Sequence, residues 1–399
     1  MNKYLLHILF ALLFISCQSL GLNNKKIIDY KVWNKGAMVS AANPYAVKAA
    51  ISILEKGGSA TDAAIAAHLV LGLVEPQSSG LGGGGFMLNY DFKTNDLTFI
   101  DGRETAPSSA KIDMFMKDDG TVMSFMEAVP SGKAVGTPGI VALYETAHKA
   151  YGLLPWSILF EDAINLSKNG FIVSSRLANY VDFAEKRGRL SKNPLTKKYF
   201  YPNDIKIKSG DLLKNPEYAN TLEAIAKEGS IAFYNSNIAK EIVSAVNADP
   251  NPGEMTLEDL KNYNTVLRPV ICGPFRNMKI CTTSPPSSGG AQIMIAGLYD
   301  QLINNESNEL EKISAFVDAQ RLAYADRDHF FGDPDEVNIP LEALLDPKYI
   351  RARAKQRFLP KTIPTPGDPS IVIDTLANFP KWGKDNTVEA AGTTHLSII

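Results

Sequence analysis

The end of the chain, from Gly392 to Ile399, has the clearest chemical potential of any stretch in the sequence. It reads Gly-Thr-Thr-His-Leu-Ser-Ile-Ile and alternates like the start of a β-strand, after a polar stretch, 376–391, typical of an exposed loop. If the Gly392-Thr393 bond is cut, the hydroxyl of Thr393 lies beside a new α-amine. That amine has an ordinary pKa of about 7.7–8.0, so nucleophile and base share one residue. The alternative is a loop that merely joins a strand.

A second chemically suggestive residue, Arg103, follows a predicted strand in the run Asp101-Gly102-Arg103-Glu104. Its planar guanidinium suits a two-point grip on a carboxylate, but an ion pair with Asp101 or Glu104 explains the pattern equally well. Four consecutive glycines, 82–85, come shortly before. They lead into a strand and are not followed by the Lys of a phosphate loop, so we expect close approach of a backbone or ligand there.

The remaining reactive residue types point away from metals and nucleic acids. Only five His are present, without a zinc-binding spacing, so we expect no metal site. We expect His68, inside an apolar helix, to be a packed core residue. The formal net charge of −2 gives no reason to expect a nucleic-acid partner. Cys272 and Cys281 flank a predicted hairpin, and either a disulfide or two buried thiols fits them.

The N-terminus predicts export. Lys3 precedes a short apolar run that is typical of a signal peptide and too short to span a bilayer. The run ends at Ser16-Cys17, which resembles the lipoprotein pattern in which Cys17 is acylated. We therefore expect residues 1–17 to be a signal peptide and the protein to be periplasmic or lipid-anchored at the bacterial cell envelope. An ordinary cleavable signal is the alternative.

The elements that must position these groups follow from hydrophobic periodicity and capping residues. We expect helices near 44–56, 60–74, 140–151, 156–169, 291–302 and 313–332, hairpins at 86–100 and 269–283, a mainly helical region at 176–265, and a surface helix at 345–358. The charges Arg321, Asp326, Arg327 and Asp328 fit either a solvated face or a buried ion-pair network. The even mixture of elements predicts one large α/β domain.

Several stretches together resemble the γ-glutamyltranspeptidases, also called glutathione hydrolases. In the family's order, they are ILEKGGSATDAAIAA, EPQSSGLGGGGFMLNY, FIDGRETAP, AVGTPGIVALYETAHKAYGLLPW, PPSSGGAQI, AQRLAYADRDHFFGDPD and GTTHLSI. The resemblance implies a four-layer αββα sandwich of the N-terminal-nucleophile hydrolases and a proenzyme that cuts itself into two subunits. Residues 27–392 would be the large subunit, and 393–399 the start of the small one.

Carried over to this chain, the resemblance assigns three residues. Self-cleavage would fall between Gly392 and Thr393, the freed Thr393 would attack the γ-carbonyl of glutathione or another γ-glutamyl donor, and Arg103 would hold the donor's α-carboxylate. The resulting ester would pass to water or to an amino acid or peptide acceptor, without a cofactor. The large subunit would pair with its own small subunit.

The resemblance also implies a departure. The family's small subunit supplies strands of the sandwich and a Gly-Gly oxyanion hole, and this chain holds only its first seven residues. We therefore expect an incomplete sandwich and no activity from the 399 residues alone. The alternatives are a cephalosporin or glutaryl acylase of the same superfamily, and a non-catalytic surface-anchored remnant.

Overall fold

A computed structural model describes residues 36–187, 190–191, 193–248, 251–356, 358–373 and 392–399. The predicted signal peptide with Cys17, and the predicted loop at 376–391, lie outside these residues. Residues 38–399 form one compact unit.

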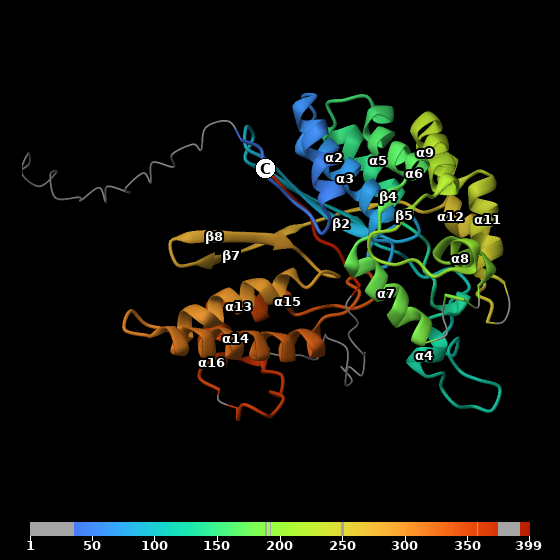
Figure 1. The fold of residues 1–399 in the computed structure, drawn as a ribbon. Helices are drawn as coiled ribbons and strands as arrows, with labels where there is room; N and C mark the ends of the chain where they lie inside the picture. The colour runs from blue at the N-terminus through green and yellow to red at the C-terminus, as the bar shows by residue number, and fades with distance from the viewer. Residues whose placement is uncertain (1–35, 188–189, 192, 249–250, 357, 374–391) are drawn as a thin grey trace, which may run out of the picture. The chain divides into compact units, whose positions relative to one another are not determined.

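The unit of residues 38–399 mixes helices with short antiparallel strands (Figure 1). Its helices are α2 (Pro44–Glu55), α3 (Ala60–Val74), α4 (Phe125–Ala128), α5 (Ile140–Tyr151), α6 (Glu161–Asn169), α7 (Ser175–Lys186), α8 (Pro194–Phe200), α9 (Pro216–Glu228), α10 (Ile231–Tyr234), α11 (Asn237–Val246), α12 (Leu257–Lys261), α13 (Gly289–Leu302), α14 (Glu309–Phe330), α15 (Leu341–Leu345) and α16 (Pro347–Arg353). Its strands are β1 (Val39–Ser40), β2 (Gly85–Asp91), β3 (Asp96–Gly102), β4 (Phe171–Ile172), β5 (Leu212–Leu213), β6 (Val266–Arg268), β7 (Val270–Phe275), β8 (Met278–Thr283) and β9 (Ser397–Ile398).

Helix α3 lies at the centre of the larger hydrophobic core. It begins with a capping box, in which Ser59 and Asp62 exchange side-chain-to-backbone hydrogen bonds, worth about 1 kcal/mol. Most of its side chains are buried, and it packs against α2, α5 and α6 (Figure 1). The prediction of a buried helix at 60–74 is confirmed, and α3 provides a rigid base for the segment that follows it.

The three-stranded sheet has the order β2-β3-β6 and is antiparallel throughout. Its hairpin pairs Gly85 with Gly102 and turns at Asn95, whose φ of 60° suits Asn. Phe99 and Ile100 on β3 are buried. The end of β3 therefore brings the backbone of Arg103 beside the glycine-rich segment.

The second hairpin, β7–β8, packs against α13, which lies on α14 (Figure 1). Its register places Cys272 directly opposite Cys281, and a disulfide joins them. The question that the sequence left open is thus answered in favour of the bond.

Helix α16 corrects one prediction in part: the helix expected at 345–358 is shorter, Pro347–Arg353, and one side of it is buried while the other is exposed. Arg353 is buried; its Nε donates to Asp326 Oδ2 on α14 at 3.1 Å, and its Nη2 lies 2.9 Å from Oδ1 in an ion pair. Tyr349 also donates to Asp326, at 2.8 Å. Asp326, one of the charged residues that the sequence analysis left open, therefore belongs to a buried ion-pair network. Its basic partner, Arg353, comes from α16.

Candidate active site

The C-terminal segment ends in a short strand, β9, which confirms the predicted strand for its last residues. β9 pairs with β1 in the register Val39 to Ile398 and Ser40 to Ser397, and Leu396 packs against the core. The backbone groups of Met38 and Ile399 exchange two further hydrogen bonds of 2.9 Å. These contacts anchor the segment just after Thr393, which is itself exposed.

The turn after α3 lies against the same segment. The Ser79 hydroxyl is 2.6 Å from that of Thr394, and a side chain added at Gly392 would come within 3.9 Å of the Gln77 carbonyl oxygen. The turn is itself held, because the carbonyl of Glu75 accepts hydrogen bonds from the backbone N–H of Ser79 and of the residue before it. The Gly392-Thr393 bond is therefore bordered by a fixed turn and followed by a fixed strand.

The glycine run makes the close approach that its composition predicts. A Cβ at Gly84 would lie 2.6 Å from the Gly102 carbonyl oxygen and 2.8 Å from the Cα of Arg103. The carbonyl of Gly83 accepts from the backbone N–H of Gly139 and Ile140 at the start of α5. A side chain at Gly84 would push the backbone of Arg103 away, so the run determines where that residue sits.

Arg103 has a fixed backbone and an exposed side chain. Its N–H donates to Asp101 Oδ1 at 2.9 Å, and its carbonyl accepts from the Tyr263 hydroxyl at 2.6 Å. Its side chain is 61% exposed, with Nε 3.5 Å from a Glu104 carboxylate oxygen and Cζ 5.8 Å from the Phe86 ring centroid. The ion pair with Glu104 is thus present, but it is long and exposed, so it leaves the guanidinium available to a ligand.

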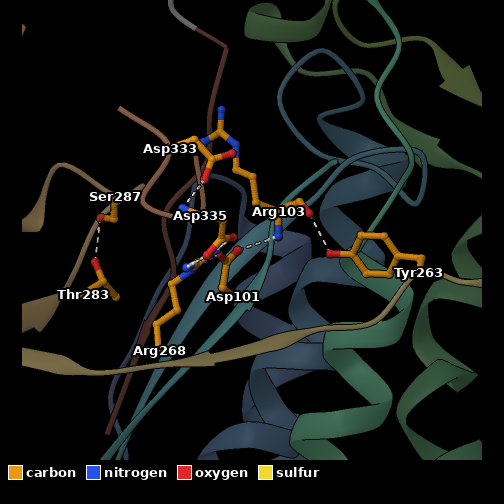
Figure 2. A network of polar contacts seen from close by, with 8 residues as sticks. All are labelled: Asp101, Arg103, Tyr263, Arg268, Thr283, Ser287, Asp333 and Asp335. Carbon is orange, nitrogen blue, oxygen red and sulfur yellow. Dashed lines mark hydrogen bonds and ion pairs between the residues drawn. The ribbon is translucent and has the colours of Figure 1, made fainter. Parts of the chain in front are cut away.

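Arg268 is a residue that sequence reasoning missed. Its Nε donates to Asp101 Oδ2 at 2.6 Å, and its two terminal nitrogens donate to both carboxylate oxygens of Asp335, at 2.9 and 2.6 Å (Figure 2). The hydrogen bond from Arg268 holds the pKa of Asp335 below its ordinary value, and burial raises the pKa of Tyr263. Neither Arg268 nor Tyr263 belongs to a recognisable motif, and Asp101 was considered only as a partner for the Arg103 side chain.

The two predicted site residues are not in direct contact. In the described part of the chain, no hydrogen bond or ion pair joins Arg103 to Thr393. Both border the segment from Glu75 to Gly85 instead: Ser79 contacts the residue after Thr393, and Gly84 contacts Arg103. This segment is the structural link between the predicted nucleophile and the predicted carboxylate-binding group.

The main cavity does not include the two predicted site residues. A cavity of about 440 Å³ is lined by Arg268, Asp335 and Ser284, among others, but by neither predicted site residue. Within the described ranges, no group of three or more His, Cys, Asp or Glu side chains could hold a metal ion. In that same part of the chain, we find no helix that is both long and apolar enough for a membrane span.

His68 is the packed core residue that the sequence predicts. Its Nδ1 makes a short hydrogen bond with the Tyr144 hydroxyl, and burial lowers its pKa from 6.5 to about 4. The folded chain therefore keeps His68 neutral where the unfolded chain protonates it. This difference contributes stability that is complete above pH 6.5 and is lost as the pH falls towards 4.

We expect the free energy of unfolding to drop by about 2 kcal/mol between pH 7 and pH 5 because of this histidine. A His68→Gln variant keeps a polar side chain but does not titrate, so its stability should fall less over that interval. Urea unfolding at both pH values measures the difference. Equal losses in the two proteins would show that His68 titrates normally.

Known proteins resemble the chain over most of its length. The family model described as "Gamma-glutamyltranspeptidase" matches residues 46–399. A relative from Bacillus subtilis (strain 168), "Glutathione hydrolase proenzyme", is 36% identical over 370 residues, which are 91% of this chain and 62% of the relative. The chain thus spans less than two thirds of that relative's length.

Solved structures agree with this result. The Helicobacter pylori γ-glutamyltranspeptidase matches with a TM-score of 0.74 and 32% identity, over 83% of this chain and 95% of that one. A cephalosporin acylase from Bacillus halodurans matches with a TM-score of 0.75 and 26% identity, over 84% of this chain and 62% of that one. The predicted fold class, an α/β chain of the N-terminal-nucleophile hydrolases, is confirmed by these matches.

Proposed function

We propose, because the chain belongs to the γ-glutamyltranspeptidase family, that it is the large-subunit part of a self-cleaving γ-glutamyl transferase or hydrolase. Residues 27–392 would form the large subunit, and Thr393 would begin the small subunit, its partner. The donor would be glutathione or another γ-glutamyl compound, and the acceptor water, an amino acid or a peptide.

One observation carries this proposal: two fixed contacts follow the Gly392-Thr393 bond within six residues. Thr393 is exposed, the Thr394 hydroxyl is 2.6 Å from that of Ser79, and β9 is paired with β1. In the proposed cleavage, the Thr393 hydroxyl adds to the Gly392 carbonyl and the C–N bond breaks. The freed nitrogen becomes the α-amine of Thr393, and water hydrolyses the ester that is left on Gly392.

The same hydroxyl would then act on the substrate. The α-amine accepts the hydroxyl proton while Oγ of Thr393 adds to the γ-carbonyl of the donor, and the leaving amine departs protonated. The Arg103 guanidinium, held by its backbone and open to solvent, would bind the α-carboxylate through two parallel hydrogen bonds. Water or an acceptor amine then releases the γ-glutamyl group.

An acylase is the second candidate, because the cephalosporin acylase from Bacillus halodurans has a similar fold. The two functions can be separated with γ-glutamyl-p-nitroanilide and glutaryl-p-nitroanilide, which differ only in the α-amino group. We expect the whole protein, expressed from its gene, to hydrolyse γ-glutamyl-p-nitroanilide with a kcat/KM at least about tenfold higher. A site that binds the α-ammonium group of a γ-glutamyl donor discriminates against a substrate that lacks this group. Turnover of the glutaryl compound alone would favour the acylase.

We further propose that residues 1–17 direct export and that Cys17 carries a lipid anchor. The support is the sequence pattern alone, since these residues lie outside the described part. Metabolic labelling with palmitate that disappears in a Cys17→Ser variant is the expected result. Equal labelling of the two proteins would argue against the anchor.

A further inference from the structure

We infer that Arg268 is a positioning residue for donor binding, which acts on Arg103 through the carboxylate of Asp101. The inference rests on the proposed role of Arg103 and adds a residue from a strand with no recognisable motif. Figure 2 shows Asp101 between Arg268 and the backbone of Arg103, with Tyr263 on the other side of Arg103.

Sheet register explains how two residues so far apart in sequence meet. Arg268 on β6 pairs with Phe99 on β3, and Asp101 lies two residues further along β3. Side chains of directly opposed residues, and of residues two positions apart, lie on the same face of a sheet. The Arg268 guanidinium therefore reaches Asp101 diagonally, with Nε 2.6 Å from Oδ2.

The ion pair between Asp101 and Arg268 is buried, so each residue depends on the other. The Asp101 side chain is 5% exposed and that of Arg268 is 11% exposed. A carboxylate at such a depth needs a charged partner, because water cannot solvate it there. Removing the guanidinium would leave Asp101 without compensation, and its other oxygen is the one that accepts from the N–H of Arg103 at 2.9 Å.

Asp101 and Tyr263 fix the peptide groups on both sides of Arg103. Both act on the backbone, whereas the guanidinium itself contacts Glu104, in the exposed ion pair, and the Phe86 ring. The network thus holds the base of a long side chain and leaves its end free for a ligand. Such an arrangement lowers the entropy that is lost when a carboxylate is bound.

Asp335 holds Arg268 in turn. Its two oxygens accept from both terminal nitrogens of the guanidinium, at 2.9 and 2.6 Å, so each of the three guanidinium nitrogens of Arg268 has a carboxylate partner. Its backbone N–H donates to Asp333 Oδ1 at 3.0 Å, which braces the loop. Because the Asp335 side chain is 58% exposed, its loss is expected to matter less than that of Asp101 or Arg268.

The test compares Arg268→Gln and Arg268→Lys in the whole protein, with γ-glutamyl-p-nitroanilide as donor. Cleavage into two subunits and kcat should stay within about threefold, while KM rises about tenfold in Arg268→Gln, the effect of losing one buried charged interaction. Arg268→Lys keeps the positive charge but cannot donate from several nitrogens at once, so its KM should lie between those of the unmodified protein and Arg268→Gln. This variant also provides the test if Arg268→Gln does not fold.

Arg276→Gln is the matched control. Arg276 also pairs with an aspartate, Asp300, with Nε 3.2 Å from Oδ1, but on the exposed turn of the β7–β8 hairpin. Its replacement should leave KM unchanged. An equal rise in KM for Arg276→Gln, or a fall in kcat with no change in KM for Arg268→Gln, would overturn the inference in favour of a general structural effect.

A double-mutant cycle with Arg103→Lys tests whether the effect passes through Arg103. If it does, Arg268→Gln should raise KM much less in the Arg103→Lys background than in the unmodified protein. Equal increases in the two backgrounds would overturn the inference. Failure of the unmodified protein to use any γ-glutamyl donor would instead overturn the proposed function, so the two failures are distinguishable.

Discussion

Replacing Thr393 with alanine in the whole protein is expected to leave a single uncut chain and to abolish turnover of γ-glutamyl donors. The substitution removes the hydroxyl that would open the Gly392-Thr393 bond, and without that cut no α-amine is released at residue 393. Loss of a nucleophile commonly lowers kcat by about 1,000-fold or more. A denaturing gel measures the cleavage, and release of p-nitroaniline measures the turnover.

Two variants give this experiment its controls. Thr393→Ser keeps a hydroxyl and should still be cut, at a reduced rate. Thr394→Ala removes the neighbouring hydroxyl, which lies 2.6 Å from that of Ser79. It should slow the cut without preventing it, because Thr394 would help to place the bond but would not attack it. Two subunits from Thr393→Ala would refute the assignment.

Elements defined by short-range patterns were predicted well. The limits of α2 and α3 follow from local caps: Asn43 with Pro44 in one case, and the box formed by Ser59 and Asp62 in the other. These signals lie within a few residues of the helix ends that they determine. The close approach at Gly84 was likewise readable, because a run of glycines before a strand has few other physical reasons.

Contacts between distant residues were not predicted. Arg268 and Asp101 are 167 residues apart, and only the pairing of β3 with β6 brings them together. Arg353 lies in a stretch predicted to be a surface helix, whereas in the structure it is buried and paired with Asp326 on α14. Charge in a sequence does not reveal burial when the compensating partner belongs to another element.

Arg103 shows the same limit at the candidate site. The sequence offered an ion pair with Asp101 or Glu104 as the alternative to ligand binding. The structure contains a pair with Glu104, but Asp101 bonds to the backbone of Arg103 and to the side chain of Arg268. The neighbouring acidic residues therefore have different roles: Asp101 fixes the backbone, and Glu104 makes a long, exposed contact with the guanidinium.

Arg103→Lys is consequently expected to raise KM for the γ-glutamyl donor by about 10- to 100-fold while self-cleavage remains intact. A lysine keeps the positive charge, but it is a point charge that cannot donate two parallel hydrogen bonds to a carboxylate. A hydrogen bond to a charged group is worth about 1.5–3 kcal/mol, which corresponds to this range. Cleavage should persist because no hydrogen bond or ion pair links Arg103 to Thr393 in the described residues.

Arg187→Lys provides a matched control for this substitution. Arg187 is also an arginine beside a phenylalanine, with Cζ 3.6 Å from the Phe183 ring centroid, at the end of α7. Arg103 is farther from its phenylalanine, with Cζ 5.8 Å from the Phe86 ring centroid, so the Arg187 change removes the closer of the two stacking contacts. Only the Arg103 variant should lose affinity, and a donor that lacks the α-carboxylate should be used equally by both variants. An unchanged KM in Arg103→Lys would mean that the guanidinium serves its pair with Glu104 and does not bind the substrate.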